Sequence, residues 1–449
     1  MDEPNGRVEQ HYATLENRWT VTDGVNEYGR LVVPFGNSDE PIHRWFHFKE
    51  AYSSHLLARV VKDLNLDSRR QLRILDCFAG GGTTLVSAVQ MASDFPDGVL
   101  AAGIERNPFL HHLASTKARA AASGESGLIS QINDDFAVVE RQFEVQLKRR
   151  HQVPELTTWK NDHYFPPRQR RRLLALHAAV EGLKSSMSRD VLLLCAAAAV
   201  EPSSRLRRDG RTLRFAESKI LRDPWEEFSR RVEVVVEDLA VNVPRKSVRA
   251  VVHLGDGRKA AEYVDEGQQF DLIIFSPPYP NNIDYTEVYK TEAWYLGAYG
   301  SQEDFRNQRL STVRSHPSVK YEDVYHYNES ENAAEVERLL APLLAAVPKD
   351  RYRSGREMII RGYADDMLAV LRSARTVIAD DGRLAFVVGN SVHGAPGSNF
   401  VIAADLIMAR LAELSCWRVE EIRIARTLHR RRVTSPYLRE SMVILGPSE

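Results

Sequence analysis

Two short apolar runs, each ending in an acidic residue, place the strongest constraint on how this chain folds. RILD (73–76) leads into the turn CFAGGGTT and a helical segment, LVSAVQMA, and a second run, GVLAAGIE, spans 98–105. Apolar runs that alternate with helical segments are typical of a parallel sheet covered by helices. The carboxyl ends of parallel strands meet at one edge of a sheet, which is where such proteins bind ligands. We therefore expect an α/β fold with Asp76 and Glu105 at that edge.

The same strand pattern returns after two long helical stretches. VRAVVHLGD (248–256), FDLIIFSPPY (270–279) and GRLAFVVGN (382–390) read as further strands, and WRVEEIRIAR with SMVILGP reads as a closing antiparallel pair. We expect a mixed, mostly parallel sheet with two mainly helical insertions. The predicted parts are a loosely packed N-terminal arm (1–40), a first core segment with the Gly-rich turn (41–120), a helical basic insertion (121–247), a second core segment (248–295), a second insertion (296–360) and a third core segment (361–449).

The bulk properties are those of a globular protein of a reducing compartment. The chain has 449 residues, a formal net charge of -1 and three cysteines at scattered positions. Single cysteines support neither a zinc ribbon nor a disulfide framework. The N-terminus lacks the features of a signal peptide, and the longest apolar run, 191–200, is too short to cross a bilayer. We expect a cytoplasmic protein of a prokaryotic cell that has no membrane partner.

The turn Ala79–Thr83 is rich in glycine and opens a helix. Glycine lets the backbone approach a ligand closely, and the N-terminus of a helix favours anionic groups. The dinucleotide pattern G-x-G-x-x-G is not met, because position 85 is Leu85, and no Walker lysine follows. By itself the turn is compatible with several cofactors, or with a simple strand–helix connection.

Glu105 ends the next apolar run. An acid at this position can accept hydrogen bonds from both ribose hydroxyls of a nucleoside cofactor. The alternative is a strand end that is merely solvated.

A second turn, Ser276-Pro277-Pro278-Tyr279, follows the strand FDLIIF. Two prolines directly after a strand end it and fix the loop rigidly. A rigid loop can hold two hydrogen-bond acceptors, the Ser276 hydroxyl and the Pro277 carbonyl, at fixed positions. The alternative is a purely structural Pro-Pro turn.

Together the two turns resemble motifs of the amino-methyltransferases of DNA. In that family an F-x-G-x-G turn binds S-adenosylmethionine and a (D/N/S)-P-P-Y turn holds the target amino group. Here the motifs read Phe78-Ala-Gly80-Gly-Gly82 and Ser276-Pro-Pro-Tyr279. Within HLGDGR (253–258), Asp256 matches the acid that contacts the cofactor adenine. The resemblance extends more loosely to HRWFHFKEAYS, GNS and RESMVIL, and covers 41–120, 248–295 and 360–446.

The resemblance implies a Rossmann-like, S-adenosylmethionine-dependent methyltransferase fold with S-adenosyl-L-methionine as cofactor and no metal. The implied cofactor-binding residues belong to the Gly-rich turn and the strand-end acids: Asp76, Phe78, Ala79, Gly80, Gly82, Thr83, Glu105 and Asp256. The implied catalytic residues are Ser276, Pro277, Pro278 and Tyr279. The two acceptors would bind both N–H bonds of the amino group of a flipped base, and Tyr279 would stack on that base.

Serine in the first position of the motif is the form most often associated with N4-cytosine methylation. We therefore expect a site-specific DNA methyltransferase that modifies the exocyclic N4 of cytosine in double-stranded DNA, with restriction or defence proteins as possible partners. The same chemistry on adenine N6 or on an RNA base is an alternative. A non-catalytic subunit that binds DNA or a partner protein in a defence complex is an alternative of another class, against which both intact motifs argue.

The first insertion carries the charge expected of a nucleic-acid surface. Residues 141–230 hold 19 Lys+Arg and 11 Asp+Glu. Clustered cations can neutralise phosphates. The candidate DNA-binding residues are Arg170, Arg171, Arg205, Arg207, Arg208 and Arg211, with Arg431 between the two closing strands, and the interleaved aromatics are Trp159, Tyr164 and Phe165. Asn281, Asn282, Asp284 and Tyr285, just past the Pro-Pro turn, are candidates for the base pocket, and the alternative for them is core and surface packing. The alternative for each basic cluster is a solvated helix face.

Overall fold

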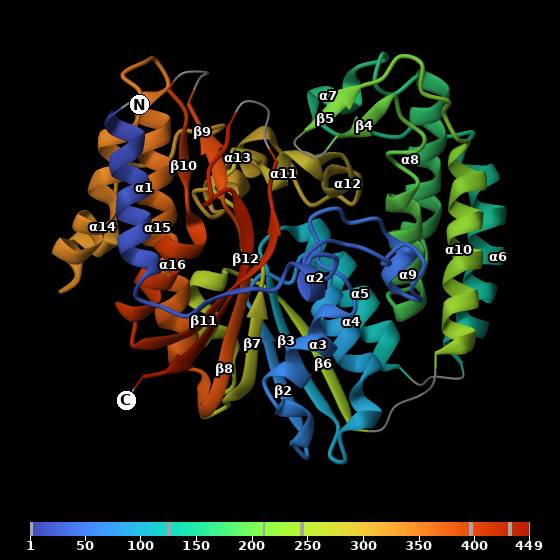
Figure 1. The fold of residues 1–449 in the computed structure, drawn as a ribbon. Coiled ribbons are helices and arrows are strands. Elements are labelled where there is room, and N and C mark those ends of the chain that lie inside the picture. Colours follow the sequence, from blue (N-terminus) through green and yellow to red (C-terminus); the bar gives the residue numbers. More distant parts are fainter. Residues whose placement is uncertain are drawn as a thin grey trace.

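An eight-stranded sheet organises the chain in the computed structural model, which describes residues 3–123, 127–209, 212–242, 247–394, 398–429 and 433–448 (Figure 1). The strand order is β1-β11-β12-β8-β7-β2-β3-β6. These strands are β1 (Val21–Asp23), β2 (Leu72–Asp76), β3 (Val99–Glu105), β6 (Val248–Leu254), β7 (Phe270–Phe275), β8 (Ile378–Gly389), β11 (Trp417–Thr427) and β12 (Arg439–Pro447). The strands expected from the sequence are thus present.

The sheet is mixed and mostly parallel, as predicted. β8, β7, β2, β3 and β6 run parallel to one another, and β12 is antiparallel to both β8 and β11. The chain proceeds from β2 to β3 and β6 on one side, and from β7 to β8 on the other. The direction of the strand order therefore reverses between β2 and β7, and ligands of open α/β sheets bind at such a switch point.

Helices cover both faces of the sheet. The longer ones are α1 (Glu3–Glu16), α3 (Leu56–Asp63), α4 (Thr83–Gln90), α5 (Pro108–Ala122), α6 (Leu128–Gln146), α8 (Pro167–Glu181), α9 (Met187–Ala198), α10 (Pro224–Val241), α13 (Gln302–Leu310), α14 (Ala333–Ala346), α15 (Arg353–Arg375) and α16 (Ala404–Glu413). In Figure 1, α1 and α14–α16 lie to the left of the sheet, and α6 and α8–α10 form a helical layer on the right. Within the described residues, no helix combines the length and apolar character that crossing a membrane requires.

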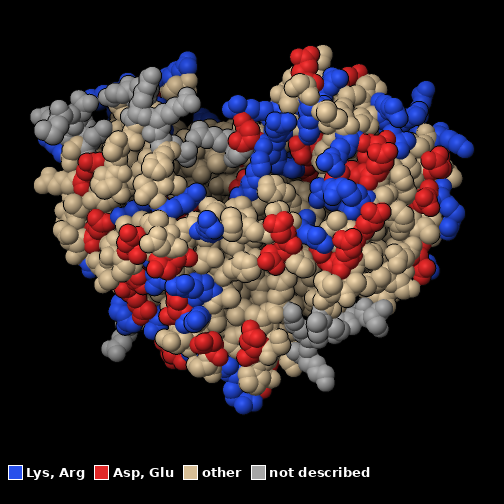
Figure 2. Space-filling model, turned by 45° about the vertical axis from the view of Figure 1, so that its right-hand side comes forward, with Lys and Arg blue, Asp and Glu red and all other residues tan. Residues whose placement is uncertain are grey.

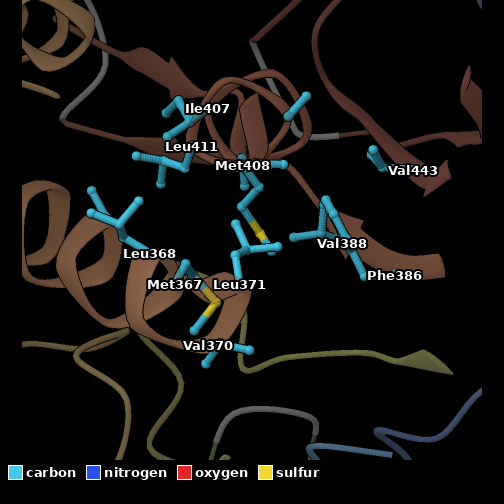
Figure 3. Packing of buried hydrophobic residues seen from close by; sticks show 14 of the residues in the cluster. Met367, Leu368, Val370, Leu371, Phe386, Val388, Ile407, Met408, Leu411 and Val443 are labelled. Carbon is cyan, nitrogen blue, oxygen red and sulfur yellow. The ribbon is translucent and has the colours of Figure 1, made fainter. Parts of the chain in front are cut away.

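Buried side chains alternate between two cores along the central strands, because successive strand residues point to opposite faces. On β7, Phe270, Ile273 and Phe275 join the core that faces α14–α16, whereas Leu272 and Ile274 join the core under α3 and α4. Figure 3 shows part of the first core, where side chains of α15, α16, β8 and β12 meet. Burial on both faces explains why these strands read as continuous apolar runs.

The N-terminal region is not the loosely packed arm expected from its polar composition. The Tyr12 side chain of α1 is fully buried and its hydroxyl donates to the Val401 carbonyl at 2.7 Å. Further on, β1 adds to the edge of the sheet, parallel to β11. The expected helical pattern over 41–64 also holds only in part. His43–Trp45 forms one 3-10 turn and α3 begins at Leu56, and the segment between them is an irregular loop that passes the cavity described below.

The basic insertion is mainly helical, as its pattern predicted, and has a core of its own. Trp159 and Phe165 are fully buried there and stack with ring centroids 4.1 Å apart. Their proposed place among surface cations is therefore wrong, because both rings point into the helical layer. Two short strands, β4 (Leu206–Arg208) and β5 (Leu213–Phe215), form a hairpin at the top of this layer in Figure 1. α7 (Thr157–Lys160) precedes α8.

The insertion is joined to the rest of the chain by buried polar contacts. Asp238 of α10, 1% exposed, accepts hydrogen bonds from the backbone N–H of Ile42 at 2.7 Å and the indole N–H of Trp45 at 2.9 Å. The guanidinium of Arg44 adds an ion pair to the same carboxylate at 2.6 Å. A second link runs through α12 (Lys290–Tyr295), where the Tyr295 hydroxyl donates to the Leu173 carbonyl at 2.9 Å.

Replacing Asp238 by alanine is expected to destabilise the protein. Two buried N–H donors would lose their acceptor, and each such loss costs about 1–3 kcal/mol. Chemical denaturation should therefore show a lower free energy of unfolding for Asp238→Ala. The matched control is Glu237→Ala, whose carboxylate is 67% exposed and 3.4 Å from Arg44, so its removal should change stability by less than about 1 kcal/mol. Equal effects of the two substitutions would contradict the structural role of Asp238.

Candidate active site

A single cavity at the carboxyl edge of the sheet brings the two predicted turns together. Its volume is about 340 Å³. Eleven of the predicted site residues line it: Asp76, Phe78, Ala79, Gly80, Thr83, Glu105, Asp256, Ser276, Pro277, Pro278 and Tyr279. The exception is Gly82, which lies behind the turn against Ala114 of α5. The two turns follow β2 and β7, the neighbouring strands at which the strand order reverses.

The Gly-rich turn is held by Asp76, the last residue of β2. Its carboxylate accepts from the Phe78 backbone N–H at 2.9 Å and from the hydroxyl of Thr84. Burial raises the pKa of Asp76 to about 6. Gly80 and Gly82 have φ angles of +51° and +81°, in the left-handed region that favours glycine. The backbone path of the turn therefore favours glycine at positions 80 and 82.

Glu105 connects the end of β3 to the same turn. Its two oxygens accept from the backbone N–H groups of Gly80 at 2.8 Å and Asn107 at 2.7 Å. Burial raises the pKa of Glu105 to about 7, although both hydrogen bonds oppose that shift. The carboxyl group thus titrates near neutral pH and fixes two loops that border the cavity.

A buried lysine supports the turn from behind. Lys117 of α5 is 2% exposed, and its ammonium group donates to the Gly81 carbonyl at 3.1 Å and to the His43 carbonyl at 3.4 Å. Burial lowers the pKa of Lys117 to about 7. Lys117 therefore ties the Gly-rich turn to the segment that precedes the loop 46–55.

Asp256, which follows β6, is fixed by a charged network. Burial alone would raise the pKa of Asp256, but the Arg258 guanidinium holds it below its usual range. Arg258 pairs with Asp256 at 2.7 Å and with Asp366 of α15 at 2.9 Å. Asp366 also binds Arg314. Asp256 is therefore held as an ionised acceptor beside the cavity.

The Pro-Pro turn presents a hydrogen-bonded chain of side chains. The Ser276 hydroxyl donates to the Tyr279 hydroxyl at 3.2 Å, and the Tyr279 hydroxyl donates to Glu440 at 2.6 Å. Glu440 is the second residue of β12 and pairs with Arg426 of β11. Burial and the neighbouring carboxylate raise the pKa of Tyr279, so its hydroxyl stays protonated.

The loop after the turn is held by β9 (Ser391–His393), which begins at the last residue of the segment GNS noted in the sequence. The Pro280 carbonyl is 2.7 Å from the Ser391 hydroxyl and 2.7 Å from Nε2 of His393. Gly389 leaves room for the Tyr279 ring, since a β-carbon there would lie 2.8 Å from a ring carbon. Tyr279 is therefore seated on β8 and cannot shift toward it.

Several cavity residues were missed by the sequence analysis. They come from four separate segments: Glu50, Tyr52, His316, Arg426 and Glu440. Glu50 accepts from the Tyr289 hydroxyl, and burial raises the pKa of Glu50. Glu50 and Tyr52 lie in the segment FHFKEAYS and Glu440 lies in RESMVIL, and the loose family matches of these two segments were the available signals. Of the residues suggested for a base pocket, Asn281 and Tyr285 line the cavity, whereas Asn282 and Asp284 do not. Asp284 instead caps α11 (Tyr285–Val288) and pairs with Arg309 at 2.8 Å.

The predicted basic residues separate into inward-facing and outward-facing groups. Arg208 is inward: its side chain is 10% exposed, pairs with the buried Glu292 and lies over the Tyr289 ring. Arg170 is bound to Asp162 at 2.8 Å and to the Trp159 carbonyl. Arg208 as a surface cation is therefore a wrong prediction.

The outward-facing group consists of arginines whose charge no acidic residue pairs with among the described residues. Arg171 and Arg207 are exposed and Arg205 is half-buried, and none of the three has an ion-pair partner among the described residues. Figure 2 shows Lys and Arg gathered on the upper part of the molecule, beside the hollow between its two lobes. Arg211 and Arg431 lie outside the described residues.

The chain is similar to known methyltransferases over most of its length. It is 25% identical over 459 residues to Type II methyltransferase M.AvaI of a Nostoc species, which covers 92% of this chain and 87% of that protein. The M.AvaI protein of Anabaena variabilis is similar to the same extent. Type II methyltransferase M.BsoBI of Geobacillus stearothermophilus is 23% identical over 443 residues, or 88% of this chain and 82% of its own length. No family model matches the chain.

These similarities and the fold agree on the class of protein. The relatives align with most of the chain, and their names support the methyltransferase class that the two motifs indicated. The mostly parallel sheet, with both motifs at its carboxyl edge, is consistent with a Rossmann-like methyltransferase.

Lys117 should make stability depend on pH in a defined direction. The pKa of Lys117 is about 7 in the folded protein, compared with 10.5 for a lysine exposed to solvent, as in the unfolded chain. Between these two pH values the unfolded chain therefore binds more protons than the folded protein. The free energy of unfolding should therefore rise with pH across this window, by up to about 1.4 kcal/mol per pH unit. Chemical denaturation at pH 7.5 and pH 9.5 measures the effect. The free energy of unfolding should increase less between these two pH values in Lys117→Met than in the wild type. The control is Lys62→Met, which alters an exposed lysine of α3. A wild-type slope that survives in Lys117→Met would contradict the lowered pKa.

Proposed function

We propose that this protein is a site-specific DNA methyltransferase that transfers a methyl group from S-adenosylmethionine to the exocyclic N4 of cytosine. The observation that carries the proposal is the convergence of the F-x-G-x-G and Ser-Pro-Pro-Tyr turns on one cavity. The similarity to Type II methyltransferases supports methylation of DNA in a restriction–modification context, with a cognate nuclease as a possible partner.

The cavity residues fit the proposed cofactor. Asn107 lines the cavity next to Glu105, and its Nδ2 is buried without a hydrogen-bond partner among the described residues. Its Oδ1 already caps α5 by accepting from Phe109 and Leu110. A buried donor without an acceptor is costly, and a ligand that offers an acceptor removes that cost. A nucleoside offers such acceptors on its ribose and its base.

The remaining binding roles follow the positions of the residues in the cavity. Glu105 would accept from the ribose hydroxyls and Asp256 from the adenine amino group, while Phe78 would contact the adenine ring. Asp76, Ala79, Gly80 and Thr83 would surround the methionine end, with Gly82 behind them. When bound, the sulfonium of S-adenosylmethionine supplies an electrophilic methyl group. In this proposal the protein supplies orientation and hydrogen bonding.

The Pro-Pro turn would activate the target amino group. That nitrogen is a poor nucleophile because its lone pair is delocalised into the ring. The Ser276 hydroxyl oxygen and the Pro277 carbonyl would accept its two N–H bonds, which favours a pyramidal nitrogen with its lone pair directed at the methyl group. These acceptors are fixed in advance and stabilise positive charge that develops on nitrogen. The base would reach the cavity by rotating out of the duplex and would stack on Tyr279.

The decisive experiment is incubation of the protein with unmethylated duplex DNA and radiolabelled S-adenosylmethionine, followed by digestion to nucleosides. Label in N4-methylcytosine is the expected result. Label in N6-methyladenine would retain the site and overturn the choice of base. Absence of label in DNA, with bound cofactor detected by calorimetry, would overturn the proposed substrate.

Substitutions in the turn should separate catalysis from folding. Ser276→Ala and Tyr279→Ala are each expected to lower the rate of methyl transfer by about 100-fold, since each removes a group that contacts the base. Ser68→Ala and Tyr352→Ala, at exposed positions, are the matched controls and should keep the wild-type rate. Methylation at the wild-type rate by both turn variants would show that this turn is not catalytic.

We propose that double-stranded DNA lies across the top of the molecule, against the hairpin β4–β5. The hairpin borders the cavity, because the ammonium group of Lys49, a cavity residue, donates to the Arg208 carbonyl at 2.6 Å. Arg205 and Arg207 of this region and Arg171 of α8 carry charge that no described acid neutralises. Unpaired cations gain most from phosphate contact, because they lose no existing partner.

Replacing Arg207 by alanine should weaken DNA binding at every sequence alike. The slope of log K against log salt should become shallower by about 1, as expected for one lost phosphate contact. Fluorescence anisotropy at several salt concentrations measures both effects. Arg338→Ala is the control, since Arg338 is 70% exposed on α14 in the opposite lobe. An unchanged slope for Arg207→Ala would remove the hairpin from the DNA surface.

A further inference from the structure

We propose that Glu440 is a positioning residue that completes a proton relay from the target amino group through Ser276 and Tyr279. The inference rests on the proposed function and adds one residue to the site, Glu440, which lies 161 positions after Tyr279 in the chain. It arises from the hydrogen bonds of the Pro-Pro turn, which run in one direction and end on a carboxylate.

The direction of the two hydrogen bonds is fixed by their ends. Ionised Glu440 can only accept, so the Tyr279 hydroxyl donates to it at 2.6 Å. The Tyr279 oxygen then accepts from the Ser276 hydroxyl at 3.2 Å. The Ser276 oxygen consequently keeps its lone pairs toward the cavity, where the amino group would lie. A hydroxyl that donates toward an anion is also a stronger acceptor, because linked hydrogen bonds polarise one another.

The residues around Glu440 fix the position of its carboxylate. Glu440 is 4% exposed and its second oxygen pairs with the Arg426 guanidinium, a cavity residue of the neighbouring strand. Gly389, directly opposite Glu440 on β8, has no side chain to displace the Tyr279 ring. Tyr285, also in the cavity, adds a second hydroxyl near the carboxylate. The carboxylate is therefore shielded from solvent and is held between Tyr279 and Arg426.

The relay accounts for the proton that methylation releases. As the nitrogen–carbon bond forms and the sulfur–carbon bond of the donor breaks, the amino nitrogen becomes positively charged and then loses one proton. That proton moves to the Ser276 oxygen, the Ser276 proton moves to the Tyr279 oxygen, and the Tyr279 proton moves to Glu440. The carboxylate ends neutral, the methylamino group ends neutral, and Ser276 and Tyr279 are restored. Serine needs this connection because its hydroxyl is too weak a base to keep the proton itself.

Two variants that interrupt the relay while keeping the shape of the site test this inference. Tyr279→Phe retains the aromatic ring and loses the hydroxyl, and Glu440→Gln retains the side-chain size and loses the charge. Each should lower kcat by about 100-fold while the KM values for DNA and for S-adenosylmethionine change by less than about threefold. The double variant should be no slower than either single variant, since members of one relay do not contribute independently.

Glu420→Gln is the matched control. Glu420 of β11 is also paired with an arginine, Arg383, but lies at the opposite end of the sheet from the cavity. It should show wild-type kcat and KM. Loss of folding in Glu440→Gln would appear as a lowered melting temperature, and the Tyr279→Phe variant then carries the kinetic test.

A measurement without turnover tests the hydrogen bond itself. In protein labelled with ¹³C at the tyrosine ζ carbon, the Tyr279 resonance is identified by its absence from the Tyr279→Phe spectrum. Glu440→Gln should shift this resonance, and Glu420→Gln should leave it in place. An unmoved resonance would overturn the relay independently of any activity.

The kinetic outcomes separate this inference from the proposed function. Methylation by the wild type together with wild-type kcat in Glu440→Gln would overturn the relay and leave the proposed function intact. Rate losses that multiply in the double variant would also overturn it, because the residues would then act separately. A wild-type protein that methylates no DNA would overturn both.

Discussion

Buried carboxylates that accept backbone N–H groups at the ends of parallel strands hold the whole site in place. Asp76 binds the Phe78 N–H, Glu105 binds the Gly80 N–H and Asp256 binds the Arg258 N–H. Each bond fixes a loop where regular pairing ends and where an unpaired N–H would otherwise be left. Because β2, β3 and β6 are adjacent in the sheet, the three loops converge on one cavity. The geometry of that cavity therefore depends on acids that are partly neutral near physiological pH, as the raised pKa values of Asp76 and Glu105 indicate.

The helical insertion is connected to the cavity through side-chain contacts. Arg208 binds Glu292 and lies over Tyr289, whose hydroxyl reaches Glu50 in the cavity wall. Lys49, the neighbour of Glu50, binds the Arg208 carbonyl. The hairpin that presents Arg207 outward is thus connected to the cavity by a short series of buried contacts. A surface that meets DNA and a pocket that receives a base would share these residues.

The sequence predicted the strands and both turns because their signals are local. Apolar runs such as FDLIIF are buried on both faces, and a Pro-Pro pair ends a strand whatever surrounds it. Other features depend on partners far away in the chain. Arg208 belongs to a run of cations that reads as surface, yet its partner Glu292 lies 84 positions later. Trp159 and Phe165 stack on each other in a core that the charge pattern concealed. Glu440 belongs to the loosely matched segment RESMVIL, which predicted a strand and gave Glu440 no role, and its pairing opposite Gly389 brings it to Tyr279.

The antiparallel placement of β12 determines which part of the site is synthesised last. Since β12 starts at the edge where the parallel strands end, its first residues deliver Glu440 to a cavity whose other walls are built from earlier segments. A ribosome that has made the chain as far as β11 has already produced the Gly-rich turn and the Pro-Pro turn, but not the carboxylate that Tyr279 binds. Folding of the C-terminal hairpin is therefore the step that completes the site. Partly synthesised or truncated chains would carry both motifs and still lack their full hydrogen-bonded arrangement.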